Sequence, residues 1–161
     1  MSEQIREQNK RNVEKLFETF SNGDLAALDQ LVAPEYVGPQ GEKGPAGFRP
    51  VVVGLRAAFP DIHYTVDELV AENDRVAVRW HWTGTHQGPF RAYPPTGKPV
   101  INSGSGIFRF KDDKVVSAGL ETDRLGFLQQ IGAVPEGVGL GPRAGSPPPR
   151  PSAEPGSSST H

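Results

Sequence analysis

The spacing of apolar residues predicts helices in the first part of the chain. Between residues 5 and 20, apolar side chains recur every three or four positions, the spacing of one helix face. Gly23 supplies a left-handed stop for this helix, and Asp24 is predicted to cap a second, shorter helix that runs through Leu31. A third helix is predicted over residues 48–59, because a proline fits its first turn and another proline follows its end.

After Pro60 the period of the pattern changes to two. The stretch RVAVRWHWTGTH places its Val and Trp residues on one side and its polar residues on the other. This alternation is typical of antiparallel strands with one buried face. The segments INSGSGIFRF and VVSAGLETD are predicted to form a hairpin that turns at residues 111–114. RLGFLQQIG then reads as a short terminal helix that ends at Gly132.

Helices followed by antiparallel strands predict an α+β fold. A long helix lying across a strongly curved sheet would make a cone-shaped barrel that encloses an apolar pocket. From residue 134 onward the chain is dominated by Pro, Gly and Ser and has almost nothing to bury. We therefore expect residues 1–133 to form the folded domain and residues 134–161 to be a disordered tail.

Composition narrows the possible functions further. The 161 residues suit a single domain, and the formal charge of −2 is spread along the chain, so we expect no nucleic-acid partner. The absence of Cys excludes disulfides, thiolate metal sites and a cysteine nucleophile. No apolar run approaches the roughly 20 residues of a membrane span, and the N-terminal segment does not read as a signal peptide. We expect a cytoplasmic protein with no membrane partner.

Four stretches of the chain together resemble the SnoaL-like polyketide cyclases, which belong to the nuclear transport factor 2-like superfamily. They are NGDLAALDQLVAPEY, LRAAFPDIHYTVDELVAENDRVAVRWHWTGTHQGPF, PPTGKPV and DRLGFLQQIG, in family order. The resemblance implies the cone-shaped fold and a polyketide-derived small molecule as substrate. It also implies a cofactor-independent cyclase that closes a ring by aldol-type acid/base catalysis, without a metal. Relatives are commonly dimers, so we expect a homodimer that pairs through the sheet face carrying Arg79 and His81.

The resemblance assigns the acid/base role to Asp123, which follows the last predicted strand. Glu121 shares strand parity with Asp123. If that side lines the pocket, burial and mutual repulsion would raise the carboxyl pKa values, so that one group could act as acid and the other as base. The alternative interpretation places Glu121 in water at the sheet rim and makes Asp123 the cap of the terminal helix.

Further candidates lie on the predicted strands and loops. His86, in GTHQGPF, is a candidate for proton transfer, or it only ties down its loop. Tyr36 and Tyr93 could also donate a hydrogen bond to a developing oxyanion, whereas Trp80 could equally be ordinary core. The candidate substrate-binding residues are Tyr36, Trp80, Trp82, Tyr93, Asn102 and Phe108.

The chain also departs from the family pattern. Gly38 stands where many members carry Asp or His, Gly119 where many carry Trp, and Phe108 where a His often precedes the Arg of the penultimate strand. Two other functions therefore stay open. One is an epoxide-opening or pyran-forming cyclase or hydratase in the same cavity, although INSGSGIF lacks the Arg and Asp that limonene epoxide hydrolase uses. The other is a non-catalytic small-molecule-binding protein of the same fold.

Overall fold

The structure is a computed structural model that describes residues 2–38 and 41–138. The helical elements are α1 (Glu3–Asn22), η1 (Leu25–Ala27), α2 (Leu28–Leu31), η2 (Gly44–Gly47), α3 (Arg49–Ala58) and α4 (Arg124–Gln130). The strands are β1 (His63–Glu72), β2 (Arg75–Thr85), β3 (Pro99–Lys111) and β4 (Lys114–Thr122). Helices followed by one antiparallel sheet confirm the predicted α+β class. Of the predicted tail at residues 134–161, the part from residue 139 onward lies outside the described residues.

Helix α1 begins and ends with capping contacts that the sequence supplies. The Ser2 hydroxyl accepts a hydrogen bond from the Ile5 N–H at 3.3 Å. Gly23 has a left-handed φ of 75° and donates its N–H to the Thr19 carbonyl at 2.8 Å, as predicted. None of the helices in the described part of the chain combines the length and the apolarity that a membrane crossing requires.

The predicted capping role of Asp24 is wrong. Its side chain makes no capping hydrogen bond, and its backbone N–H is instead bound by the Asn22 side-chain oxygen at 2.8 Å. The chain then makes a 3₁₀ turn before α2 begins at Leu28. Because the first turn is 3₁₀, the second helix is shorter than the sequence suggests.

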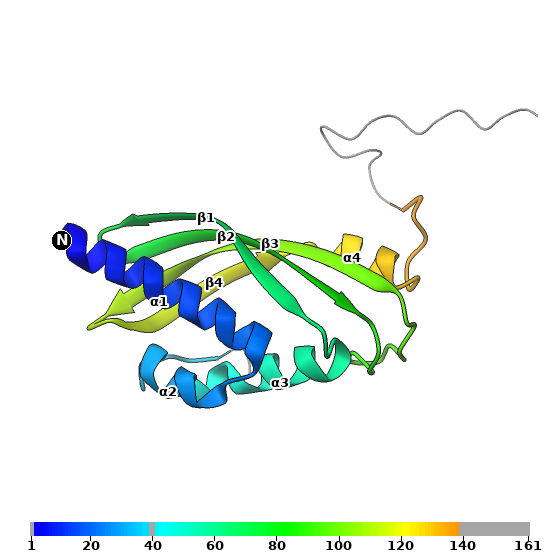
Figure 1. The fold of residues 1–161 in the computed structure, drawn as a ribbon, viewed down its shortest axis with the longest axis horizontal. Helices are drawn as coiled ribbons and strands as arrows, with labels where there is room; N and C mark the ends of the chain where they lie inside the picture. The colour runs from blue at the N-terminus through cyan, green and yellow to red at the C-terminus, as the bar shows by residue number, and fades with distance from the viewer. Residues whose placement is uncertain (1, 39–40, 139–161) are drawn as a thin grey trace, which may run out of the picture.

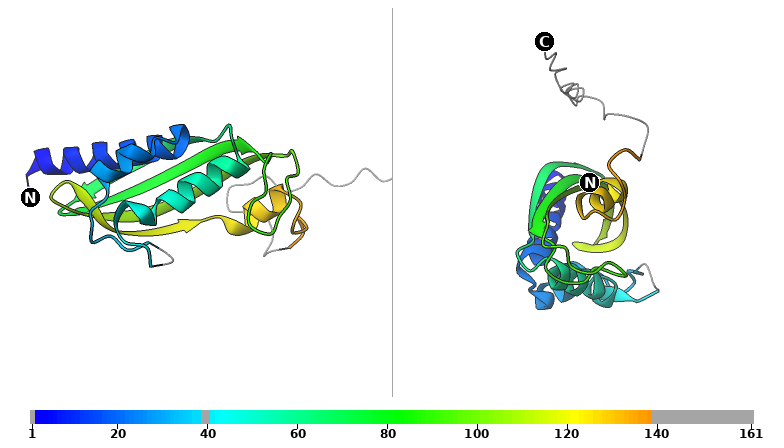
Figure 2. Two further views of the ribbon diagram at one scale, coloured as in Figure 1. Left: turned by 90° about the horizontal axis from the view of Figure 1, so that it is seen from below. Right: turned by 90° about the vertical axis from the view of Figure 1, so that its right-hand side faces the viewer.

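The strands form one sheet in the order β1-β2-β3-β4, with every neighbouring pair antiparallel. The pairing shifts register at residues 66–68 and 109–110, and such irregularities bend a strand and increase its twist. The sheet arches over α1, α2 and α3 (Figures 1 and 2). Helix α4 lies at the end of the molecule where β3 begins and β4 ends (Figure 1).

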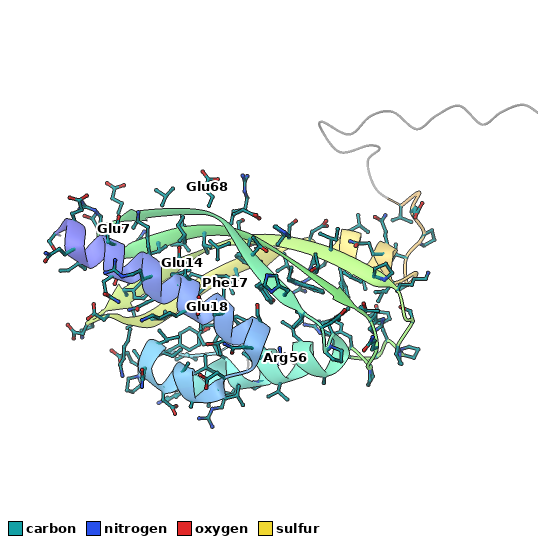
Figure 3. The ribbon with its side chains drawn as sticks, viewed as in Figure 1. Glu7, Glu14, Phe17, Glu18, Arg56 and Glu68 are labelled. Atoms are coloured by element: carbon teal, nitrogen blue, oxygen red, sulfur yellow. The ribbon has the colours of Figure 1, made fainter. Side chains whose placement is uncertain are left out.

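The hydrophobic core fills the space between α1 and the inner face of the sheet. Phe17 projects from α1 toward the strands (Figure 3), and its ring centroid lies 5.1 Å from that of Trp80 and 6.0 Å from that of Phe108. Trp80 lies directly over Gly104, where a Cβ atom would come within 2.4 Å of the indole. The glycine in NSGSG therefore makes room for a large ring on the inner face, as its small size suggests.

Candidate active site

An aromatic cluster lies at the end of the cone near α4. It consists of Phe59, Trp82, Phe90 and Phe127, which come from the C-cap of α3, from β2, from the loop after β2 and from α4. The ring centroids of Phe59 and Trp82 lie 4.8 Å apart, and those of Phe90 and Phe127 lie 5.1 Å apart. The imidazole of His86 stacks on Phe59, with centroids 5.3 Å apart and an interplanar angle of 28°. His86 is fully buried, so this ring is part of the protein interior.

The backbone around His86 is fixed against the end of α3. The N–H groups of Gln87 and Gly88 both donate to the Ala58 carbonyl at 3.0 Å. A Cβ atom at position 88 would lie 2.1 Å from the Ala57 carbonyl oxygen, so only glycine fits this approach. The GTHQG segment therefore joins the end of β2 to the end of α3 and sets the position of the histidine.

A second set of contacts comes from the segment before β3. The His86 N–H donates to the Lys98 carbonyl at 2.9 Å, and the Gly97 N–H donates to the His86 carbonyl at 2.8 Å. The Nδ1 atom of His86 lies 3.0 Å from the Thr96 hydroxyl oxygen. These contacts bring together two stretches that the sequence analysis singled out separately, GTHQGPF and PPTGKPV.

Two buried polar atoms at this end of the molecule have no hydrogen-bond partner. They are His86 Nε2 and Asn102 Oδ1. Asn102 is 9% exposed and lies on the inner face of β3, where its register partner on β2 is Trp82. A buried polar atom without a hydrogen-bond partner lowers the stability of the fold by about 1–3 kcal/mol. Two such atoms close to one aromatic cluster therefore point to a functional role. Within the described residues the third such atom is Asn9 Oδ1 of α1.

Asp123 is the N-cap of α4. Its carboxylate accepts a hydrogen bond from the Gly126 N–H at 2.9 Å, and its own N–H donates to the Ser103 carbonyl at 3.1 Å. The side chain is half-buried. The capping interpretation made from the sequence is therefore confirmed. A capping bond holds a carboxylate in one orientation, and the catalytic role of Asp123 stays a prediction.

Glu121 does not line the interior, and the alternative interpretation, which places its carboxyl group in water, is confirmed. Glu121 pairs with Ser105 in the same register row as Arg79, whereas Trp80 shares its inner row with Gly104 and not with Glu121. Glu121 is exposed, so its carboxyl group faces outward. Strand parity put Glu121 on the same side as Asp123, but parity alone does not say which face of a sheet is inside.

The predicted substrate-binding residues divide into two groups. Trp82 and Asn102 belong to the candidate site, and the half-buried Tyr93 lies in the loop between β2 and β3, where it exchanges two backbone hydrogen bonds with Phe90. The others pack as core: Trp80 and Phe108 lie against Phe17, and Tyr36 stacks on Phe48 with centroids 4.6 Å apart. Burial, and secondarily the Glu42 carboxylate, raise the pKa of Tyr36 above its usual range.

Sequence reasoning missed Phe59, Phe90, Thr96 and Phe127. Each lies in a stretch quoted for the family resemblance, namely AAFPD, GTHQGPF, PPTGKPV and DRLGF, but no local pattern connects these stretches. Across residues 2–38 and 41–138, no three His, Asp or Glu side chains are grouped so that they could hold a metal ion.

The outer face of the sheet carries a hollow. Its volume is about 410 Å³, and apolar side chains line it together with charged ones. Arg79 and Glu68 form an ion pair at 3.3 Å, and Glu68 projects away from the helices (Figure 3). The apolar lining includes Val70, Ala77 and Ile107. This face has no buried unpaired side-chain atom among the described residues.

Solved structures share this fold along most of both chains. TsrD from Streptomyces laurentii is 28% identical with a TM-score of 0.75, and the match covers 80% of this chain and 98% of that one. A candidate polyketide cyclase from Acidithiobacillus ferrooxidans is 33% identical with a TM-score of 0.69, covering 77% of this chain and 94% of that one. Wild-type IdmH from Streptomyces antibioticus, another candidate polyketide cyclase, is 31% identical with a TM-score of 0.67, covering 78% and 99%.

Comparison with curated proteins gave no match. The sequence profile of the family described as SnoaL-like polyketide cyclase matches residues 10–131. Because this match spans most of the chain, the protein belongs to the SnoaL-like polyketide cyclase family, which confirms the resemblance found in the sequence.

Proposed function

We propose that this protein is a cofactor-independent cyclase that closes a ring in a polyketide-derived natural product by acid/base catalysis. The observation that carries the proposal is the pair of buried, unpaired atoms His86 Nε2 and Asn102 Oδ1 beside the aromatic cluster. A substrate that supplied hydrogen-bond partners to both atoms would remove the cost of leaving them unpaired. Binding energy gained in this way would also fix the orientation of the substrate.

The reaction that fits is an intramolecular aldol closure. A base removes the proton from a carbon next to one carbonyl group, that carbon attacks a second carbonyl carbon, and the new alkoxide oxygen receives a proton. One carbon–carbon bond forms, and the numbers of atoms and electrons do not change. In this proposal Asp123 is the base, and neutral His86 donates from Nε2 to the oxygen as its negative charge develops. The proton that Asp123 took from carbon then passes through solvent to the oxygen, or to the imidazolate left on His86 if the Nε2 proton has been transferred, and both residues return to their starting states.

The aromatic cluster would supply the shape of the site. Phe59, Trp82 and Phe127 present flat apolar surfaces, which suit a planar substrate and exclude water from the reacting carbons. Holding both ends of one chain close together removes much of the entropy that ring closure otherwise costs. This proximity effect is worth up to about 7–11 kcal/mol in well-oriented intramolecular reactions.

The test uses a panel of aromatic β-keto esters that carry a ketone on a neighbouring side chain, so that the acidic carbon of the ester can reach a second carbonyl carbon and close a ring. Purified protein is incubated with each compound, and the products are followed by liquid chromatography with mass detection. We expect a product of unchanged mass, or of that mass less one water. His86→Gln should lower turnover by a factor of about 10²–10⁴, the usual worth of general acid–base catalysis.

The matched control is His63→Gln, the same substitution at an exposed histidine of β1. It should leave turnover unchanged. Full activity of His86→Gln at unchanged melting temperature would contradict the proposal. Tight binding of these esters without turnover would support the non-catalytic alternative, and turnover of only an epoxide-bearing analogue would support the epoxide-opening alternative.

A further inference from the structure

The contacts of His86 Nδ1 bear on which ring nitrogen carries the proton. A neutral imidazole has one N–H group, and the hydrogen bond made by one nitrogen fixes the role of the other. The only polar contact that the described residues give to His86 Nδ1 is the Thr96 hydroxyl, at 3.0 Å. Thr96 therefore governs what His86 Nε2 presents to the candidate site.

The surroundings of Thr96 favour one direction for that hydrogen bond. The Lys98 backbone N–H points at the same hydroxyl oxygen, at 3.4 Å, and a backbone N–H can only donate. The oxygen thus accepts from Lys98 through one of its two lone pairs. Among the described residues, His86 Nδ1 is the one acceptor in contact with the hydroxyl, so donation to Nδ1 is the direction that also gives the hydroxyl hydrogen a partner. With Nδ1 acting as an acceptor, the ring hydrogen sits on Nε2.

We propose that Thr96 is a positioning residue that holds neutral His86 with its N–H on Nε2, so that His86 presents a hydrogen-bond donor to a substrate oxygen. The unpaired Asn102 Oδ1 is an acceptor, so the site then offers one donor and one acceptor. Such a site suits the oxygens of an enolised 1,3-dicarbonyl compound, where one oxygen accepts and the other donates. The catalytic consequence rests on the proposed function, whereas the position of the proton does not.

The position of the proton can be measured without any substrate. Protein labelled with ¹⁵N-histidine is studied by two-bond ¹H–¹⁵N correlation NMR at a pH where the ring is neutral, and the His86 signals are identified by their loss in His86→Gln. We expect wild-type His86 to be in the Nε2–H form. Thr96→Val removes the hydroxyl, so a fraction of His86 should move to the Nδ1–H form. Thr96→Ser, which keeps the hydroxyl, should restore the wild-type spectrum.

The control is Thr83→Val, the same change at an exposed position of β2, which should leave the His86 signals unchanged. An Nδ1–H form in the wild type, or a wild-type spectrum from Thr96→Val, would overturn the inference. With an ester that the protein converts to product, Thr96→Val should lower kcat about tenfold, which is the effect of losing one ordinary hydrogen bond, with little change in KM. If the NMR result holds but no ester reacts, the tautomer assignment stands and the proposed function fails.

Discussion

The two faces of the sheet differ in whether their polar groups have hydrogen-bond or ion-pair partners. On the inner face, His86 and Asn102 keep buried polar atoms that no described residue satisfies. On the outer face, charged groups are paired with each other, while Val70 and Ile107 stay 57% and 52% exposed. Unsatisfied polar atoms inside an apolar interior indicate a site for a small ligand. Satisfied charges around exposed apolar side chains are more typical of a surface that another protein covers.

Two histidines on β2 and its end illustrate the same difference. His81 is partly exposed on the outer face, and its Nδ1 lies 2.9 Å from both carboxylate oxygens of Asp67. His86 is fully buried, and its Nδ1 contacts a neutral hydroxyl group. The partner of His81 is therefore a charged group near the surface, as for Arg79 and Glu68 on the same face. His86, with a neutral partner and an unpaired Nε2, is the histidine that can form a hydrogen bond with a substrate.

The largest expected effect is the loss of turnover when Asp123, at the candidate active site, is replaced. Asparagine caps helices as well as aspartate, so Asp123→Asn should keep α4 and melt within a few degrees of wild type. Because the variant cannot accept a proton, turnover of a β-keto ester substrate should fall by a factor of about 10²–10⁴. Steady-state kinetics and thermal melting of the same preparation provide both measurements.

Asp123→Ala serves as the control that removes the cap as well. It should lose the same turnover and also about 1 kcal/mol of stability. If Asp123→Asn is stable and fully active, the carboxylate is a helix cap only, and His86 must carry the proton transfer without it.

The second expected effect is on stability. Phe59 is fully buried and contacts His86, Trp82 and other rings of the aromatic cluster. Phe59→Ala should lower the free energy of unfolding by about 3–5 kcal/mol, the usual cost of truncating a buried aromatic side chain. Urea denaturation measures the loss. Val51→Ala, in the helix that Phe59 follows but exposed, should change stability by less than about 0.5 kcal/mol. Equal losses from both variants would show that the cluster is not a tightly packed part of the interior.

The sequence predicted the fold better than the site, for a physical reason. Alternation along β2 and the three- to four-residue spacing of α1 reflect burial of one face, which is a local pattern. The site depends on pairings between distant segments, such as His86 with Thr96 and Phe59 with Phe127. Nothing in the spacing of these residues encodes such contacts.

Glu121 shows what the local sequence pattern cannot predict. Alternation assigns residues of β4 to two faces, but the face that becomes the interior is decided by Trp80 over Gly104 and by the helices packed against it. The resemblance named Asp123, and the structure adds a capping bond that the sequence allowed only as an alternative. His86 was a candidate from its motif, but its complete burial is a property of the fold.

A third prediction concerns the outer face. We propose that the protein is a homodimer that buries this face, because exposed Val70 and Ile107 line its hollow and charged groups surround them. Val70→Lys places a charge in the centre of that surface and should convert the dimer to a monomer. Sedimentation velocity at micromolar concentration gives the mass of each species.

Val53→Lys is the matched control, since Val53 is 54% exposed on α3 and Val70 is 57% exposed on β1. It should stay dimeric. A wild-type monomer would contradict the proposal. A dimer that survives Val70→Lys but dissociates with Val53→Lys would move the interface to α3.

The smallest expected effect lies at the strand ends that lead into the interior site. Asp61 accepts hydrogen bonds from the Thr85 N–H and the Thr85 hydroxyl, each at 2.8 Å, and these bonds lower the pKa of its carboxyl group. A carboxyl whose pKa is lower in the folded state stabilises the fold at neutral pH. This contribution is lost as the pH falls below the ordinary aspartate pKa of about 3.9 and through the folded value. Since Asp61 is exposed, the effect should be small.

Asp61→Asn tests this contribution, because the amide oxygen can still accept one hydrogen bond but carries no charge. The melting temperature of the variant should lie below that of wild type at pH 7, and the difference should shrink steadily from about pH 4 toward about pH 2. Glu14→Gln, at an exposed position of α1, is the control and should show no such convergence. A difference between wild type and Asp61→Asn that stays constant over this range would mean that the two bonds to Thr85 hold the strand ends by geometry alone. The position of His86, one residue beyond Thr85, would then not depend on the charge of Asp61.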